Sequence, residues 1–216
     1  MITEKMLDEL RDAIRERMDE PRYRHTLGVE REMRHLAELY LPDLVQVAAA
    51  AGLLHDVTKS FSQDEQLDYC AENGIAVSKE ERAAYRVLHA KTGAHFVKSN
   101  YPRFADDIIL RAIERHTVAD KDMRVMDILL YIADFIEEGR RYPDCIELRR
   151  AFYDGIASHE DDRVSFLYEI FVKALDLSLS ELLREGRFIF LKTVEARNAA
   201  LQTRIDLRGK NNLTQY

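Results

Sequence analysis

The chain has 216 residues, the size of one ordinary globular domain, and 46% are hydrophobic, enough for a sizeable core. Only 8 glycines and 4 prolines are present, which argues against hairpin-rich sandwiches and barrels. The formal net charge of −7 disfavours nucleic acid and anionic membranes as partners, because phosphate backbones attract basic surfaces. A site that handles phosphates would therefore need a local cluster of cations or metal ions.

The N-terminal segment and the cysteines carry no targeting or redox signal. Residues 1–9 lack the apolar core of a signal peptide, and the longest apolar run, 47–54, is too short to span a bilayer. Cys70 and Cys145 fit no zinc-binding or CxxC spacing. We expect a reduced, cytoplasmic protein without a membrane segment.

Apolar residues recur at helical spacing along almost the whole chain. The first stripe, Met6 to Met18, predicts a helix that ends before Pro21, because the residue preceding a proline avoids the α region. A second helix is predicted over 24–40, and a third from an Asp43 N-cap through the apolar run 45–54. Further helices are predicted over 63–73, 79–99, 104–116, 124–138, 145–157, 161–184 and 193–204.

Glycine- or proline-containing breaks separate these segments, and no strand-like alternation or internal repeat interrupts them. The sequence therefore predicts an all-α fold, a single helical bundle. We expect an N-terminal amphipathic helix (1–20) packed on the main domain, the domain itself over 21–205, and a frayed tail over 206–216.

Two sets of acidic and imidazole groups stand in apolar surroundings. His55 and Asp56 follow a segment, 48–54, that is apolar nearly all round, and Asp134 lies inside the apolar run 128–136. Buried charges need partners, so these groups require a metal, a cation or a hydrogen-bond network. A frayed, solvent-facing helix end for Asp56 and a buried ion pair with an arginine for Asp134 are the structural alternatives.

Three further histidines extend this set: His25, His89 and His116. Each alone is more often an ordinary surface or capped histidine. Together the six residues supply four imidazoles and two carboxylates on five predicted helices. Imidazole combined with carboxylate suits first-row ions such as iron, manganese or zinc better than calcium or magnesium. We therefore prefer a metal site.

Cationic residues accompany the candidate ligands. Lys59 follows Asp56 by three positions and His55 by four, which places it on their face if the helical turn continues. Arg22 lies near His25 in the sequence, and Arg140 follows the segment that contains Asp134. A solvated surface charge is the commoner outcome for each of these cations.

The order His25, His55-Asp56, Asp134 resembles the H…HD…D pattern of the HD-domain metal-dependent phosphohydrolases. The surrounding stretches resemble the YqeK-type subgroup, which is associated with symmetrical cleavage of diadenosine tetraphosphate to two ADP at a di-iron centre. The resemblance covers roughly residues 20–200 and is carried by the stretches 22–29, 51–59, 114–117 and 131–140.

The resemblance implies a two-metal site with iron favoured and manganese or another first-row ion as an alternative. One ion would be held by His25, His55, Asp56 and Asp134, and the second by His89 and His116 with Asp56 bridging. Metal-activated hydroxide would attack phosphorus and displace ADP. Asp56 and Lys59 are the predicted catalytic residues, and the predicted substrate-binding residues are Arg22, Lys59, Thr117 and Arg140.

The chain departs from the family pattern at four places. Thr58 replaces Ala, Ala119 replaces Gly, Glu138 replaces Pro, and Phe190-Leu191 replace His-Pro. None removes a predicted ligand, but Ala119 and Phe190-Leu191 could alter the nucleotide pocket. Alternatives stay open: an HD phosphohydrolase for another nucleotide (a deoxynucleotide, a nucleoside monophosphate or a guanosine alarmone), a nucleotide-binding signalling protein with little turnover, or a plain helical module. A homodimer is also allowed.

Overall fold

Helices account for the regular structure of residues 1–213, which the computed structural model describes, with side chains described for residues 1–208. This confirms the predicted all-α class. Short 3-10 turns precede several helices: η1 (Pro42–Leu44), η2 (Tyr85–Val87), η3 (Pro102–Phe104) and η4 (Ala157–Asp162). The α-helices are α1 (Glu4–Arg15), α2 (Glu20–Tyr40), α3 (Val45–Leu54), α4 (Gln63–Glu72), α5 (Lys79–Ala83), α6 (Leu88–Asn100), α7 (Asp107–Arg115), α8 (Val125–Ile136), α9 (Pro143–Ile156), α10 (Arg163–Arg184) and α11 (Leu191–Leu213).

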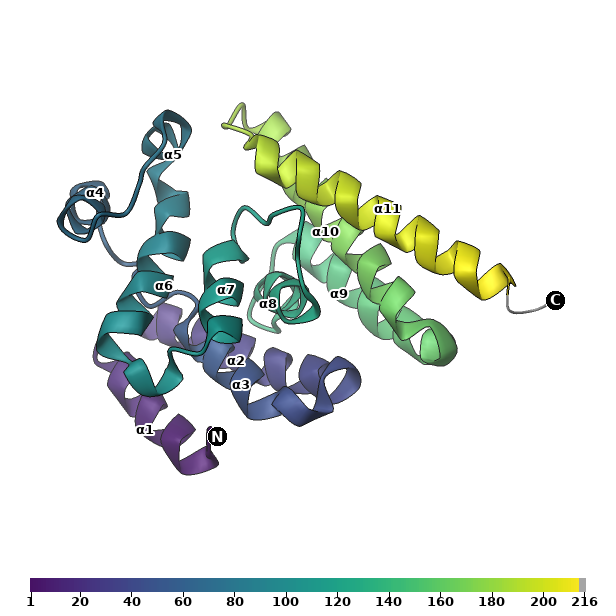
Figure 1. The fold of residues 1–216 in the computed structure, drawn as a ribbon, viewed down its shortest axis with the longest axis horizontal. Helices are drawn as coiled ribbons and strands as arrows, with labels where there is room; N and C mark the ends of the chain where they lie inside the picture. Colours follow the sequence, from purple (N-terminus) through teal and green to yellow (C-terminus); the bar gives the residue numbers. More distant parts are fainter. Residues whose placement is uncertain (214–216) are drawn as a thin grey trace.

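The helix α8 runs through the middle of the bundle (Figure 1). The α2–α3 hairpin and α7 pack against α8 on one side, and α9 and α10 pack against it on the other. The long helices α10 and α11 run antiparallel as an outer pair (Figure 1). Because α8 is apolar along most of its length, it is covered by helices from distant parts of the sequence. None of the described helices combines the length and apolar character that a transmembrane span requires.

The contact between α2 and α3 is unusually close. All residues from Ala48 to Leu54 in α3 are buried, as their nearly uniform apolar character predicts. A Cβ atom on Gly52 would lie 3.0 Å from Cα of Glu30 in α2, so a larger residue would require the two backbones to move apart. This close approach holds the end of α3, and therefore the His55-Asp56 pair, in the interior of the bundle.

Two predicted helix starts are wrong. The second helix begins at Glu20 rather than at residue 24, because Pro21 lies in its first turn, where a missing N–H costs nothing. Asp19 caps this helix by accepting the Arg22 N–H at 2.8 Å. Asp43 does not cap the third helix: it lies within η1, and α3 begins without a side-chain cap.

Two other predicted helices have different extents. The segment 79–99 is not one helix, because α5 ends at Ala83 and η2 intervenes before α6 begins at Leu88. This break places His89 in the first turn of α6. The last helix reaches Leu213, past the predicted end at residue 204 and through most of the predicted tail. Residues 214–216 of that tail lie outside the described residues.

We predict that Gly52→Ala lowers the free energy of unfolding by about 1–3 kcal/mol, because the new methyl group pushes α3 away from the α2 backbone. Urea unfolding followed by circular dichroism measures the change. Gly93→Ala in α6 is the matched control, since its Cβ would come no closer than 3.4 Å to a neighbour, Ile113. Equal stability of both variants would contradict the close α2–α3 contact.

Candidate metal centre

Six side chains from five helical segments meet inside the bundle. They form two groups in which the potential ligand atoms all lie within 4.8 Å of one another. The first group comes from α2, the end of α3 and α8, and the second comes from the turn after α3, the start of α6 and the end of α7. The groups are His25, His55 and Asp134, and Asp56, His89 and His116. The structure thus brings together all six ligands predicted from the sequence.

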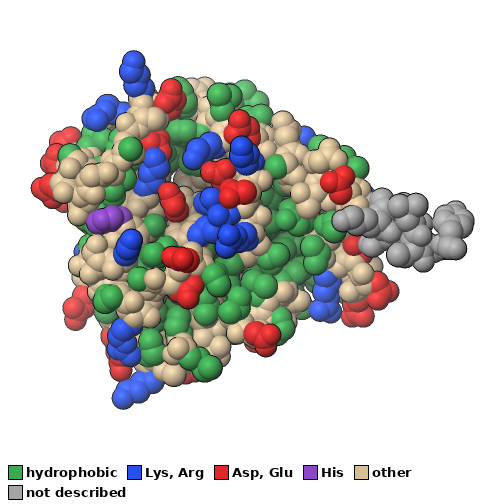
Figure 2. All heavy atoms as spheres, in the orientation of Figure 1, with side chains coloured by type: hydrophobic (Ala, Val, Ile, Leu, Met, Phe, Trp, Pro, Cys, Tyr) green, Lys and Arg blue, Asp and Glu red, His purple; other side chains and the backbone are tan. Residues whose placement is uncertain are grey.

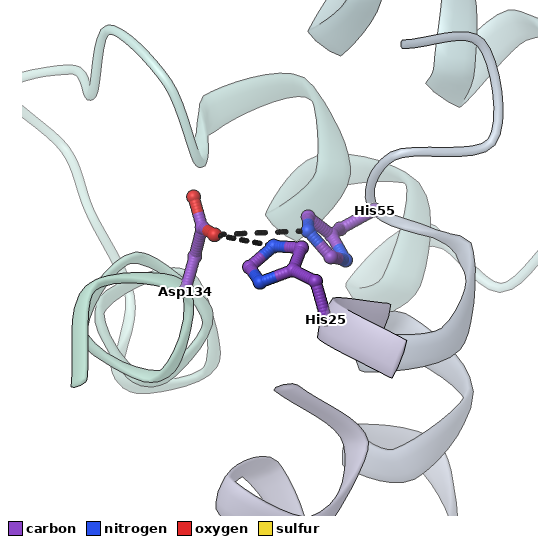
Figure 3. A group of neighbouring side chains, drawn as sticks. All are labelled: His25, His55 and Asp134. Carbon is purple, nitrogen blue, oxygen red and sulfur yellow. Dashed lines mark ion pairs between the residues drawn. The ribbon is translucent and has the colours of Figure 1, made fainter. Parts of the chain in front are cut away.

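In the first group, two imidazoles point at one carboxylate oxygen (Figure 3). Oδ1 of Asp134 lies 3.0 Å from Nε2 of His25 and 3.8 Å from Nε2 of His55. In the second group, Nε2 of His89 lies 3.0 Å from Nε2 of His116 and 3.2 Å from Oδ1 of Asp56. Each group therefore presents nitrogen and oxygen atoms at mutual distances suited to one shared cation.

Asp56 lies between the two groups. Its Oδ1 faces the second group, 3.2 Å from Nε2 of His89 and 3.6 Å from Nε2 of His116. Its Oδ2 faces the first group, 3.4 Å from Nε2 of His55 and 4.0 Å from Nε2 of His25. A carboxylate that offers one oxygen to each group is placed as a bridging ligand, which is the role that the resemblance implies.

All four imidazoles direct Nδ1 away from the centre to an oxygen acceptor. In three of them this acceptor is the backbone carbonyl three residues earlier: Gly52 for His55 (2.7 Å), Arg86 for His89 (2.5 Å) and Ile113 for His116 (2.6 Å). The Gly52 and Ile113 carbonyls are free because they belong to the last turns of α3 and α7, and Arg86 lies in the 3-10 turn η2 before α6. Nδ1 of His25 instead lies 3.1 Å from Oε1 of Glu137. In the three imidazoles that face a carbonyl, the bond places the proton on Nδ1 and leaves the Nε2 lone pair aimed at the centre.

Several of the nitrogen and oxygen atoms that face the centre have no hydrogen-bond partner. Among the described side chains, Nε2 of His25, Nε2 of His55 and Oδ1 of Asp56 are buried without a hydrogen-bond partner. A buried acceptor without a partner costs about 1–3 kcal/mol. A cation at each group would satisfy these acceptors, and four imidazoles with two carboxylates are the ligand set of first-row transition metals. The residues present therefore fit two metal ions.

The protonation states suit this assignment for most ligands. Burial alone would raise the pKa of Asp56, but His55 and Lys59 outweigh it and hold that pKa well below its usual range. Burial, assisted by the nearby Lys59 ammonium, lowers the pKa of His89 to about 4. Burial also lowers the pKa of His25, but Asp134 and Glu137 outweigh it and raise the pKa to about 9. A cation at His25 must therefore compete with a proton.

The predicted cationic residues lie directly at the centre. Arg22 donates from Nη1 to Oδ2 of Asp56 at 2.6 Å, and Arg140 donates from Nη2 to Oδ1 of Asp134 at 2.6 Å. Nζ of Lys59 lies 3.0 Å from Nε2 of His89 and 3.8 Å from Oδ1 of Asp56. Figure 2 shows Lys and Arg side chains gathered beside Asp and Glu side chains near the middle of one face, where α8 is seen end-on in Figure 1.

The remaining predicted site residue is Thr117, whose hydroxyl lies 3.2 Å from Nε2 of His89 and 3.3 Å from Nε2 of His116. Lys59 lies beside Asp56 as expected, but the backbone between them is not the continued helical turn that the sequence predicted. After α3 the chain forms tight turns, in which the Lys59 N–H donates to the Asp56 carbonyl at 2.9 Å. These turns still place Lys59 beside Asp56.

Two residues of the site were not predicted. Glu137 is buried, orients His25 and accepts the Gly139 N–H at 2.6 Å. Its signal was a carboxylate directly after the apolar run that contains Asp134. Arg86 supplies the carbonyl that orients His89, and its side chain lines a cavity together with Arg22 and Lys59. No sequence signal distinguished Arg86 within a segment predicted as one long helix.

The family model described as "HD domain" matches residues 22–177 of this chain. The protein named "Bis(5'-nucleosyl)-tetraphosphatase, symmetrical" of Halalkalibacterium halodurans is 30% identical over 138 residues, which cover 63% of this chain and 71% of that protein. The protein with the same name in Bacillus subtilis is 29% identical over 138 residues, which cover 64% of this chain and 73% of that protein.

A solved structure from Clostridium acetobutylicum is also similar. It is described as a predicted HD superfamily hydrolase involved in NAD metabolism, and it aligns with a TM-score of 0.78 at 28% sequence identity. The alignment covers 91% of this chain and 97% of that chain. The structural similarity therefore covers a larger share of this chain than the residues 22–177 that the family model matches.

We predict that the protein purified without chelator holds about two metal ions per chain and that Asp56→Ala holds fewer than one, because this carboxylate serves both groups. Elemental analysis by inductively coupled plasma mass spectrometry measures the content, and circular dichroism checks that the helices persist. The matched control is Asp12→Ala, an exposed carboxylate on α1. Full metal content in Asp56→Ala would refute the bridging role.

Proposed function

The chain belongs to the HD domain family, and we propose that it is a metal-dependent hydrolase that cleaves diadenosine tetraphosphate symmetrically into two ADP. The observation that carries this proposal is the position of Asp56 between two groups of imidazoles that present Nε2 inward. The relatives named as symmetrical tetraphosphatases supply the substrate class.

We propose two first-row transition-metal ions, with iron favoured, held by the six ligands and bridged by Asp56. Such ions would supply Lewis acidity that activates water and offsets phosphate charge. The surrounding residues fix the orientation of the proposed ligands. Hydrogen bonds at Nδ1 orient the imidazoles, and Arg22 and Arg140 donate to the carboxylates of Asp56 and Asp134.

We propose that the substrate phosphates bind in a cationic cavity beside the second group. It has a volume of about 280 Å³, and its lining includes Arg22, Lys59 and Arg86. Guanidinium and ammonium groups bind phosphate oxygens with charge-assisted hydrogen bonds, so this cluster can attract a tetraphosphate to a chain whose net charge is −7. Thr117 adds a hydroxyl near His89 and His116, and Arg140 adds a cation on the Asp134 side.

The proposed reaction adds a water oxygen to one of the two inner phosphorus atoms of the tetraphosphate. The bond from that phosphorus to the oxygen bridging the inner pair breaks, and the bridging oxygen leaves with the other ADP. Lys59 and Arg22 neutralise the charge that builds on the phosphate oxygens during this displacement.

The direct test is incubation of the protein with diadenosine tetraphosphate and separation of the products by ion-exchange chromatography. We expect ADP as the product, and Asp134→Ala to abolish turnover while the helical circular dichroism signal is retained. Formation of ATP and AMP would overturn symmetrical cleavage. Normal turnover in Asp134→Ala would overturn the site assignment.

A second prediction concerns Lys59, which faces Asp56 and His89 without being one of the proposed ligands. We expect Lys59→Met to lower kcat/KM by about 10²-fold while the metal content stays at the wild-type level, because the lost charge stabilises the reacting phosphate. Lys98→Met, an exposed lysine on α6, is the matched control. Loss of metal from Lys59→Met would show that this lysine supports the ligands instead.

We further propose that the bound metal is iron, that the protein is cytoplasmic and that a homodimer is an allowed oligomeric state. Elemental analysis identifies the metal, and size-exclusion chromatography with light scattering measures the mass against 25.2 kDa for one chain.

A further inference from the structure

The loop that follows α8, residues 137–140, carries two side chains that support the first metal group. Oε1 of Glu137 lies 3.1 Å from Nδ1 of His25, and Arg140 donates from Nη2 to Oδ1 of Asp134 at 2.6 Å. The loop is closed by the Arg140 N–H, which donates to the Glu137 carbonyl at 3.0 Å. The geometry of the first group therefore depends on where the 137–140 loop lies.

The Glu137 carboxylate is held closely on two sides. From within the loop, its Oε2 accepts the Gly139 N–H at 2.6 Å. From α2, Gly28 stands three residues after His25, and a Cβ atom on Gly28 would overlap Oε2 of Glu137. The carboxylate reaches His25 because residue 28 has no side chain, so a small shift of the loop would press it against α2 or draw it away from Nδ1.

One side chain of α9, Arg149, holds the backbone of this loop. Its Nε donates to the Ile136 carbonyl at 2.6 Å, and its Nη2 donates to the Glu137 carbonyl and, at 2.9 Å, to the Arg140 carbonyl. The end of a helix leaves such acceptors without a helical partner. A planar guanidinium binds several acceptors in fixed directions, whereas a lysine ammonium is a compact point charge. The loop therefore takes its place from α9.

We propose that Arg149 is a positioning residue for the first metal group. By fixing three backbone carbonyls it sets the places of Glu137 and Arg140. These two side chains in turn set the directions of the His25 imidazole and the Asp134 carboxylate. The inference rests on the proposed function in one respect, because it takes metal ions as the occupants of the two groups.

The effect of Arg149 falls on one of the two proposed ions. The second group is built on α6, the end of α7 and the turn after α3, and the hydrogen bonds of Arg149 all go to residues 136–140 instead. Loss of the guanidinium should therefore loosen the first group and leave the second as it is.

The test is dialysis of the Mn²⁺-loaded protein against decreasing free Mn²⁺, with the bound metal measured by mass spectrometry. We expect the wild type to hold two ions, and Arg149→Met to hold one of them with a Kd about tenfold higher and the other with the wild-type Kd. Methionine keeps much of the apolar stem and removes the donors. The matched control is Arg150→Met, the exposed neighbour on α9, which should bind both ions as the wild type does. Wild-type binding by Arg149→Met would overturn the inference.

A second variant identifies the ion that responds. Asp134→Ala lacks the carboxylate of the first group, so we expect it to retain only the ion of the second group. Adding Arg149→Met to Asp134→Ala should leave the affinity of that remaining ion unchanged. Weaker binding of the remaining ion in the double variant would show that Arg149 acts on the whole bundle and would overturn the inference.

Hydrogen exchange followed by mass spectrometry examines the loop itself. We expect the amides of residues 137–140 to exchange faster in Arg149→Met than in Arg150→Met, because three carbonyl contacts are lost. Faster exchange together with wild-type affinity for both ions would mean that Arg149 stabilises the loop without positioning ligands, which contradicts the inference. If Arg149→Met does not fold, Arg149→Lys takes its place, with a Kd for the same ion about threefold higher because the ammonium lacks the planar fork. Unchanged binding there would contradict the inference as well.

Turnover of diadenosine tetraphosphate separates this inference from the proposed function. If the wild-type protein fails to hydrolyse the dinucleotide but binds one Mn²⁺ in an Arg149-dependent way, the proposed reaction is wrong and the positioning role stands. If it hydrolyses the dinucleotide and Arg149→Met binds both ions as the wild type does, the reaction stands and the positioning role is wrong. A wild-type protein that binds no Mn²⁺ overturns both.

Discussion

The buried carboxylate of Asp56 imposes the main constraint on this structure. It is 3% exposed, and one of its oxygens has no hydrogen-bond partner among the described residues. Burying an ionised group is costly unless positive charge surrounds it. The protein places Arg22 and Lys59 at the two oxygens, and two imidazoles beside each. The fold can therefore be understood as the scaffold that delivers these groups to one point.

Three of the four imidazoles are positioned by the ends of helices. His55 and His116 each follow a helix directly, and His89 follows the 3-10 turn η2. Each bonds a carbonyl three residues earlier, so a backbone group left free at a helix end fixes the imidazole tautomer. The site needs few additional side chains for orientation, and Glu137 serves His25, whose imidazole comes from within α2 rather than from a helix end.

The sequence alone predicted the site where a polar or charged residue interrupts an apolar helical pattern. Asp134 is a polar residue in an apolar helix, and His55 and Asp56 directly follow one, so their burial and their need for partners could be predicted. Arg86 and Phe188 carry no such conflict, since a charged residue and an apolar residue near helix ends are ordinary. Both residues line one cavity because the α10–α11 turn meets η2, a tertiary contact that no local periodicity encodes. For the same reason the break between α5 and α6 was missed.

The departures from the family pattern fall mainly on the side of the second group. The Thr58 hydroxyl is buried, and it donates to the His89 carbonyl at 3.1 Å and lies 2.9 Å from the Thr92 hydroxyl. Ala119 has φ of 62°, a left-handed conformation that glycine adopts freely and that costs alanine about 1 kcal/mol. Phe190 lines a cavity whose walls also include Tyr85, Arg86 and Thr117.

These substitutions leave every proposed ligand in place, and they change the support of His89 and the walls beyond Thr117. The bond from the Thr193 hydroxyl to the Val118 carbonyl (2.7 Å) links the start of α11 to the segment that contains Ala119. A change in the α10–α11 turn is therefore coupled mechanically to the loop beside His116. Variation of this half of the centre leaves the proposed ligands in place, because His55 and His116 are oriented by helix-end carbonyls rather than by the cavity walls.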